Sequence, residues 1–389
     1  MPHSTYTKNQ PLNTPSEQDG VKFNFITHSR GESRICVTNQ NKEFLLIRKI
    51  KGDKTLIKTD KVTRVTPINI VKEAINAYTK ITNAQITSTN TNIISEKLKP
   101  QDEYLKDIDY FVNEFDTDKE IYIEIGFGSG RHLIHQAKQN PNIQFIGLEI
   151  HTPSIEQMLK QVRIDNITNI LAVDYDARLF MEFIKSNRVG RIFVHFPVPW
   201  DKKPHRRIYS QDFIDEALRV LKVGGSLELR TDSRKYFDYC VELLTTQPSG
   251  HITIDINKDL AVSSKYEDRW KFQGKNIYDL KLFNNYENEE KNLNYDFSFD
   301  KEVDIEKLDK EFDKSAIVKD NFVVSFSDFY ISDDRHTALL QLTMGNVNRT
   351  VSKYILIQNK KASYFQGDPL PTSSNIAAHK IIKQKVQCD

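Results

Sequence analysis

The middle third of the chain alternates short apolar runs with amphipathic segments, and this alternation restricts the possible folds most strongly. Runs rich in β-branched and aromatic residues occupy residues 121–125, 145–150, 170–173, 191–196 and 226–230, with helical spacing between them. Parallel strands need crossover connections of this kind, usually helical. The pattern predicts an α/β domain built on a doubly wound central sheet.

The regions on either side of this domain are richer in short β-type runs. Residues 21–65 predict a small antiparallel meander, residues 70–78 a helix, and the polar residues 83–100 a linker. After residue 283 an acidic stretch poor in large aliphatic residues predicts a second, solvated linker. Residues 321–366 predict another small antiparallel sheet, and residues 374–386 a basic terminal helix. We therefore divide the chain into residues 1–100, 101–285 and 286–389.

Charge and cysteine content exclude several classes of protein. The chain has 55 Lys and Arg against 53 Asp and Glu, so any attraction to nucleic acid must come from a local patch. Its three cysteines lie far apart without ligand spacing, which predicts neither a disulfide framework nor a metal site. No run approaches the ~18 apolar residues of a membrane span or resembles a signal peptide. We expect a cytoplasmic protein without a membrane segment; the sequence leaves the oligomeric state open.

The segment EIGFGSG places glycines between the first predicted strand of the domain and a helix. Gly126, Gly128 and Gly130 would let the backbone approach a ligand, beside unpaired N–H groups of the helix start. The spacing differs from the dinucleotide fingerprint, and Glu124 precedes the first glycine by two residues. The plainer interpretation is a tight strand-to-helix connection.

Acidic residues at three successive strand ends favour a ligand. S-adenosylmethionine carries an ammonium and a sulfonium but no phosphate, so Glu124 suits it better than it suits a pyrophosphate. Glu149 lies where a carboxylate accepts from ribose hydroxyls, and Asp176, with Asp174 as the alternative, can reach the adenine. Each alone would be an ordinary loop carboxylate. Together they predict one ligand edge.

A rigid turn followed by a basic loop comes after the fourth strand, in FPVPWDKKPHRR. Pro197 and Pro199 flank Val198 and fix the direction of Trp200. A charge run is usually a solvated surface, but this one follows a strand end that faces the expected donor. We therefore interpret it as a phosphate-contacting surface made by Lys202, Lys203, Arg206 and Arg207.

These motifs, together with GLEIH, DYDA, a Gly-Gly pair before LRTD, and SSKYEDR, resemble the bacterial tRNA (guanine-N7)-methyltransferase family over residues 119–283. The resemblance implies a class I methyltransferase fold, Rossmann-like, here flanked by two small β-rich regions. It also implies S-adenosylmethionine as methyl donor and N7 of guanine 46, in the variable loop of tRNA, as acceptor.

The resemblance and the residue patterns together give an expected set of site residues. The donor-site residues are Glu124, Gly126, Gly128, Gly130, Glu149 and Asp176. The tRNA-site residues are Trp200, Lys202, Arg206, Arg207, Asp232, Ser264, Lys265, Tyr266 and Glu267. Asp232 and Glu267 are the candidate catalytic carboxylates, with Asp201 a weaker third. Trp200, Tyr266 and Trp270 are candidates for stacking on a base.

The chain departs from the family pattern in two places. The family has an aspartate between the two prolines, where this chain has Val198, and its basic loop is longer. N7 of guanine has a lone pair and no proton, so the transfer depends mainly on positioning.

Three questions stay open at this point. A methyltransferase for a small molecule or protein would not need the basic loop, and Val198 suits a non-catalytic RNA-binding protein. The basic segments KIKGDKTLIK and KVTR and the terminal KIIKQK either extend the grip on tRNA or belong to stabilising appendages.

Overall fold

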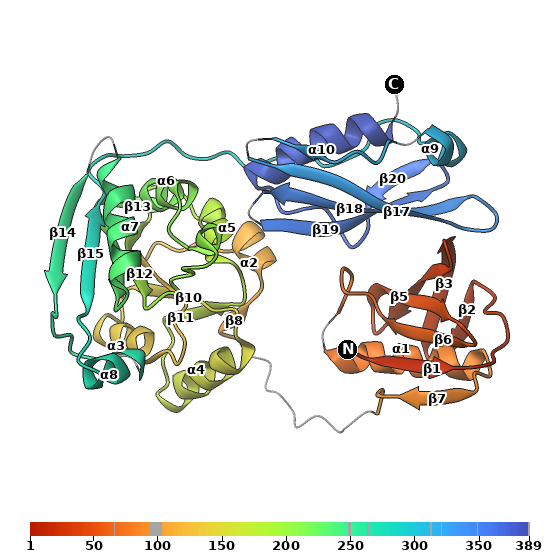
Figure 1. The fold of residues 1–389 in the computed structure, drawn as a ribbon, viewed down its shortest axis with the longest axis horizontal. Helices are drawn as coiled ribbons and strands as arrows, with labels where there is room; N and C mark the ends of the chain where they lie inside the picture. Colours follow the sequence, from red (N-terminus) through yellow and green to blue (C-terminus); the bar gives the residue numbers. More distant parts are fainter. Residues whose placement is uncertain are drawn as a thin grey trace. The chain divides into compact units, whose positions relative to one another are not determined.

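The computed structural model describes residues 1–65, 67–92, 103–247, 250–262, 265–311, 313–319, 321–347 and 349–387. Two compact units make up the chain, and Figure 1 colours both along the sequence. One unit, Leu98–Leu293, contains the domain that resembles a methyltransferase in sequence, and we call it the methyltransferase unit. The appended unit combines Met1–Lys97 with Asn294–Asp389. Each unit is described by itself.

A mixed sheet forms the centre of the methyltransferase unit. Its order is β14-β15-β13-β12-β9-β10-β11-β8, parallel from β13 to β8, with β15 and β14 antiparallel. The strands are β8 (Leu105–Lys106), β9 (Ile121–Ile125), β10 (Gln144–Leu148), β11 (Ile170–Val173), β12 (Val189–His195), β13 (Leu221–Thr231), β14 (His251–Ile256) and β15 (Tyr278–Phe283). Parallel strands running outward from a central β9 are the class I methyltransferase arrangement, so the predicted fold class is confirmed.

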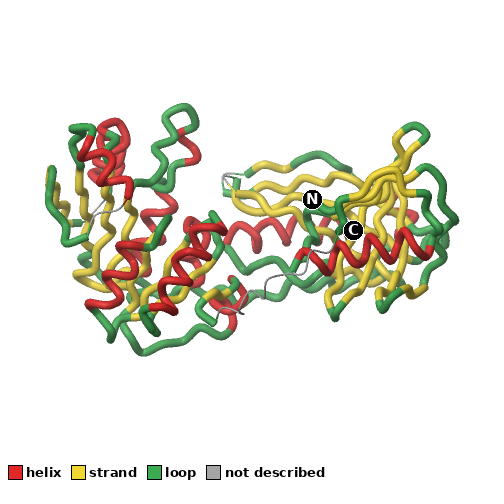
Figure 2. Tube along the Cα trace, turned by 90° about the horizontal axis from the view of Figure 1, so that it is seen from below, coloured by secondary structure: helices red, strands yellow, loops and turns green. Residues whose placement is uncertain are grey.

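Helices cover both faces of this sheet because neighbouring strand residues point to opposite sides. Phe145 of β10 packs with α3 and α4, whereas Ile146 joins the core that contains α6 and α7. In Figure 2 helices of this unit, drawn in red, lie beside its strands, drawn in yellow. The helices are α2 (Ile108–Asn113), α3 (Arg131–Gln139), α4 (Thr152–Ile164), α5 (Ala177–Phe180), η1 (Met181–Phe183), η2 (Pro204–Arg206), α6 (Gln211–Val220), α7 (Arg234–Thr245) and α8 (Lys265–Phe272).

Both ends of the chain contribute strands to one antiparallel sheet in the appended unit. Its main order is β20-β19-β18-β17-β3-β4-β5-β6-β1-β7, with β2 on β3 and β16 on β17. The N-terminal elements are β1 (His3–Tyr6), β2 (Ser16–Gln18), β3 (Val21–Ser29), β4 (Glu32–Asn39), β5 (Lys42–Lys51), β6 (Lys54–Thr59), α1 (Ile68–Ile81) and β7 (Ile86–Thr89). The C-terminal elements are α9 (Ile305–Glu311), β16 (Ile317–Val318), β17 (Val323–Ile331), β18 (Thr337–Asn346), β19 (Arg349–Gln358), β20 (Lys361–Tyr364) and α10 (Ser373–Val386).

Buried polar contacts join the two ends of the chain within this unit. The Arg34 guanidinium donates to the hydroxyls of Tyr354 and Tyr330, at 2.9 and 2.7 Å. The Tyr354 hydroxyl donates to Asp60 at 2.6 Å. A small apolar core packs around them, from Cys36 and Leu45 on one side to Leu339 on the other. The N- and C-terminal regions, which the sequence analysis treats separately, therefore share one core.

Two expected linkers contain more structure than predicted. Within residues 83–100, β7 pairs with β1 and forms the edge of the sheet, because Thr-rich segments suit an exposed sheet edge. Residues 93–102 lie outside the described residues. The acidic stretch after residue 283 buries Phe297, Val303 and Leu308 in the core beneath β17–β19. A few well-placed apolar side chains anchor a segment that is polar on average.

The described residues contain neither a candidate membrane-spanning helix nor a candidate metal site. None of the helices found there is long and apolar enough to cross a membrane. Within the same residues, no cluster of three or more His, Cys, Asp or Glu could hold a metal ion. Cys36 and Cys240 are buried, free thiols.

Candidate active site

The glycine turn forms the start of α3 at the carboxyl end of β9. Gly128 has a φ of 54° and Gly130 a φ of 72°, conformations that favour glycine. A Cβ on Gly130 would lie 2.3 Å from Cγ of Met158, so α4 packs directly against this turn. A Cβ on Gly126 or Gly128 would meet nothing within 4 Å, so the backbone there faces open space. Both the tight connection and the accessible backbone predicted from sequence are present.

Glu149 is held in place by backbone N–H groups at the end of β10. Its carboxylate accepts from the N–H groups of Gly128 at 3.0 Å, Ile150 at 2.9 Å and His151 at 3.0 Å. These bonds fix the side chain next to the glycine turn and leave lone pairs for further donors. A carboxylate fixed in this way can accept from a pair of ribose hydroxyls.

The two acidic residues after β11 differ in their surroundings. Asp176 is 8% exposed, caps α5 through the N–H of Arg178 at 2.8 Å, and pairs with the Arg178 guanidinium at 3.2 Å. Asp174 is exposed at the same strand end. Both residues lie at the expected edge, and the sequence-based alternative between them stays open.

Glu124 is buried in an ion pair with His132. The residues are 3% and 7% exposed, and His132 Nδ1 lies 2.7 Å from the carboxylate. Burial lowers the pKa of His132, but the charge and hydrogen bond of Glu124 outweigh it and raise the pKa above the ordinary value. Burial and the neighbouring His132 hold the pKa of His195, whose ring centroid is 4.4 Å from that of His132, well below its ordinary value. Of these two rings, His132 therefore binds a proton more readily than His195.

We expect this ion pair to stabilise the methyltransferase unit more at low pH than at high pH. A raised folded-state pKa gives stability that is complete below the unfolded value of ~6.5 and is lost as pH rises through the folded value. The free energy of unfolding of the native protein should exceed that of His132→Asn most at pH 6 and least at pH 9. Unfolding in urea can be followed by tryptophan fluorescence, because Trp200 and Trp270 both lie in this unit. If the difference in free energy of unfolding between the native protein and His132→Asn did not change with pH, the raised pKa of His132 would be wrong.

The FPVPW segment leaves the sheet in an unusual backbone conformation. Phe196 and Trp200 have φ values of 49° and 46°, so left-handed residues bracket the two prolines. Such conformations cost energy and persist only where surrounding contacts enforce them. Val198 is 59% exposed at the tip. The partly buried Arg207 guanidinium donates to the Pro199 carbonyl at 2.9 Å and lies 4.4 Å from the Tyr239 ring centroid. Arg207 thus braces the turn, although the sequence suggests it as a phosphate contact.

The rest of the basic loop faces solvent. Lys202, Lys203 and Arg206 are exposed, and the last lies in the short helix η2. The Arg206 guanidinium lies 5.2 Å from the ring centroid of Trp200, which is partly buried. The loop therefore presents cations at the carboxyl end of β12, beside the loops after β9 and β10.

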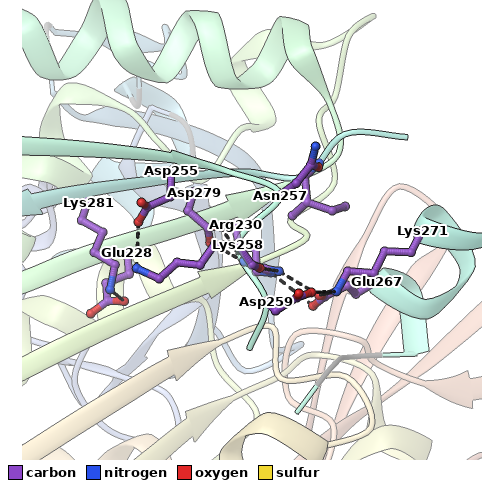
Figure 3. Close-up of polar contacts among 11 residues, drawn as sticks. Glu228, Arg230, Asp255, Asn257, Lys258, Asp259, Glu267, Lys271, Asp279 and Lys281 are labelled. Carbon is purple, nitrogen blue, oxygen red and sulfur yellow. Dashed lines mark hydrogen bonds and ion pairs between the residues drawn. The ribbon is translucent and has the colours of Figure 1, made fainter. Parts of the chain in front are cut away.

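A buried arginine holds two expected tRNA-site segments together. Arg230, at the end of β13, is 1% exposed and lies between the carboxylates of Glu267 and Asp279 (Figure 3). Its guanidinium reaches Glu267 at 2.7 Å and Asp279 at 2.5 Å and donates to the Lys258 carbonyl at 2.8 Å. Glu267 is itself 1% exposed and also pairs with Lys271 at 3.0 Å. Its carboxylate anchors α8 to the sheet.

Asp232 lies two residues beyond Arg230 and is partly accessible. Its carboxylate pairs with Lys275 at 2.7 Å, and the same ammonium lies 3.6 Å from the ring centroid of Trp270. Lys265 and Tyr266 begin α8, while Ser264 lies outside the described residues. Phe272, at the end of α8, is 93% exposed.

Sequence reasoning missed two residues that organise the site, His132 and Arg230. His132 lies in the first turn of α3, where its partner Glu124 becomes apparent only once the turn is folded. Arg230 lies within the LRTD motif itself, and an arginine between apolar residues near the end of a central strand is a signal that could have identified it.

Comparison with known proteins adds the family. A family model described as "Putative methyltransferase" matches residues 118–280. A Wolinella succinogenes protein named tRNA (guanine-N(7)-)-methyltransferase is 41% identical, covering 99% of both chains. Proteins of the same name from Helicobacter hepaticus, 38% identical over 99% of both chains, and Campylobacter jejuni, 37% identical over 100% of this chain and 99% of the other, also match. The resemblance seen in the motifs is confirmed, and the chain belongs to the tRNA (guanine-N7)-methyltransferase family along its length, β-rich ends included.

Proposed function

We propose that this chain transfers the methyl group of S-adenosylmethionine to N7 of the variable-loop guanine 46 of tRNA, in the cytoplasm. The observation that carries the proposal is the full-length match to proteins named for this activity. The site supports the proposal, because the glycine turn and the exposed cations of the basic loop lie at the carboxyl ends of parallel strands. This is the edge at which such sheets bind ligands.

The residues present fit the donor. The open backbone at Gly126 and Gly128 offers room for a ligand, and Glu149 is fixed to accept from ribose hydroxyls. Asp176 or Asp174 serves the adenine end. Glu124, buried and paired with His132, fixes α3 behind the turn.

Methyl transfer to N7 requires the chain to position the two reactants and does not require a general base. The donor supplies an electrophilic methyl group, and N7 of guanine attacks with a lone pair that needs no deprotonation. The exposed Val198 is therefore compatible with transfer, provided that other residues orient the guanine. We assign orientation to Asp232, which can accept from the guanine amino group. Glu267 positions α8 through Arg230, and Lys202, Lys203 and Arg206 contact phosphates.

Glu149→Ala should weaken donor binding about 10- to 100-fold, since hydrogen bonds to a charged group contribute about 1.5–3 kcal/mol. The fold should persist because the residue is partly exposed at a strand end. Equilibrium titration with S-adenosylmethionine measures the change. Glu149→Gln is the matched control, because it keeps one acceptor oxygen and should lose less. Unchanged affinity in Glu149→Ala would show that the ribose contact is misplaced.

The proposed function is tested with labelled donor and unmodified tRNA. Purified protein should transfer label to tRNA, and borohydride treatment followed by chain cleavage should map a single N7-methylated guanine in the variable loop. Binding of tRNA without any N7-methylguanosine would instead indicate a non-catalytic RNA-binding protein.

A further inference from the structure

The appended unit contains a cavity of about 700 Å³ between strands from the two ends of the chain. Its walls come from β1, β6 and the residues just after β6 on the N-terminal side, and from β18 and β19 on the C-terminal side. The volume lies within the ~300–1,000 Å³ typical of ligand sites. We call it the β6 cavity. Its lysines belong to the basic segments KIKGDKTLIK and KVTR, to which the active site gives no role.

Three lysines make the β6 cavity positive. Lys54, Lys58 and Lys61 line it, and none of them forms an ion pair with another described residue. Among the described residues that line the cavity, Asp60 is the only acidic one. Its carboxylate already accepts from the Tyr354 hydroxyl at 2.6 Å and lies 3.3 Å from the Arg34 guanidinium. The cavity therefore offers uncompensated cations and suits a polyanion.

The lysines of the basic terminal helix α10, unlike those of the β6 cavity, mostly form ion pairs. Lys383 of α10 pairs with Asp300 at 3.2 Å, and Lys385 pairs with Asp313 at 2.6 Å. The helix packs on β17 and β18 by its buried face, which includes Ala378 and Ile382. Two of the three lysines of KIIKQK are thus neutralised within the appended unit, and Lys380 alone is exposed without an ion pair to another described residue. The segments KIKGDKTLIK and KVTR, which contain Lys54, Lys58 and Lys61, therefore keep more cations available to a partner.

Apolar and small side chains complete the lining. Ile47, Leu56 and Val62 provide apolar surface, and Thr5 and Ser352 provide hydroxyls. A nucleotide has the matching pair of features, an apolar base face and an anionic phosphate. We propose that the β6 cavity binds a nucleotide segment of the tRNA substrate, with its phosphates on Lys54, Lys58 and Lys61. This inference rests on the proposed function, since tRNA is the RNA supplied to the protein.

The first test removes the charges in the full-length chain. The triple variant Lys54→Gln, Lys58→Gln, Lys61→Gln should bind unmodified tRNA at least ~10-fold more weakly in moderate salt. The slope of log affinity against log salt should become shallower by about two, since each phosphate contact contributes ~0.7–0.9. The matched control is Lys314→Gln, Lys319→Gln, Lys361→Gln, three exposed lysines of the same unit outside the cavity. Equal behaviour of the two triples would overturn the inference.

The second test fills the β6 cavity without changing charge. Ser352 is an exposed residue of β19 in the lining, so Ser352→Trp should block entry while the strand persists. We expect weaker tRNA binding than in Thr350→Trp, whose site lies two residues away on β19 and outside the lining. Binding equal to that of Thr350→Trp would also contradict the proposal.

Donor titration and methyl transfer by the unmodified chain separate this inference from the proposed function. The cavity variants should bind S-adenosylmethionine normally. If the unmodified chain methylates tRNA but the cavity variants bind it as their controls do, only the cavity proposal fails. If the unmodified chain methylates nothing while the cavity variants lose tRNA binding, only the proposed function fails.

Discussion

Arg230→Met should lower the free energy of unfolding of the methyltransferase unit by about 3–5 kcal/mol, because it removes the guanidinium that compensates two buried carboxylates, Glu267 and Asp279. Glu267 and Asp279 are 1% and 6% exposed, so solvent cannot replace the guanidinium. The same change releases α8 from the strand end that carries Asp232, so methyl transfer should fall as well. Urea unfolding followed by tryptophan fluorescence reports on this unit, and the labelled-donor assay reports on transfer.

The matched control for this variant is Arg234→Met. Arg234 is four residues away and pairs with Asp238 at 2.7 Å, but both side chains are more than half exposed. Exposed pairs contribute less than about 1 kcal/mol, so the control should be nearly neutral. Adding Glu267→Gln and Asp279→Asn to Arg230→Met removes the unpaired charges and should restore part of the stability without restoring transfer. If transfer returned together with stability, Arg230 would be only a structural residue and not a positioning residue.

The central fold could be predicted from sequence because its signals are local. Each of the five predicted strands overlaps one of the observed strands β9–β13, since buried parallel strands appear as short apolar runs between helical segments. The predicted helices over 70–78 and 374–386 correspond to α1 and α10. The union of the two chain ends was not predictable in this way. It depends on contacts such as Arg34 with Tyr354, which lie 320 residues apart, and no local pattern marks such a pair.

The site was predictable to a similar depth. Glycines at left-handed positions and carboxylates at strand ends are visible in the sequence because backbone geometry restricts which residues can stand there. Which groups a charged side chain contacts depends on the tertiary structure and is not visible in the local sequence. Arg206 and Arg207 are adjacent and look alike in sequence, yet Arg207 is partly buried and braces the PVPW turn, whereas Arg206 is exposed. Glu267 differs likewise from Asp232, since only the former is fully buried.

Reversing the exposed cations of the basic loop should produce the largest loss of tRNA affinity. The variant Lys202→Glu, Lys203→Glu, Arg206→Glu should bind tRNA ~100-fold or more weakly at physiological salt, with a log–log salt slope shallower by about two. Arg207 is left intact so that the turn keeps its brace. Donor affinity should stay within ~2-fold, because Glu149 and the glycine turn lie on other loops.

The control for this loop reverses the same number of charges elsewhere in the methyltransferase unit. Lys119→Glu, Lys160→Glu, Arg163→Glu changes two lysines and one arginine that are exposed before β9 and on the later part of α4. Because the chain has a formal net charge of only +2, both variants become equally negative overall, and only the position of the lost cations differs. Filter binding or fluorescence anisotropy across a salt series would separate them. Equal losses of tRNA affinity in both variants would mean that tRNA binding depends on the overall charge of the protein. The proposal that the basic loop contacts the phosphates would then be wrong.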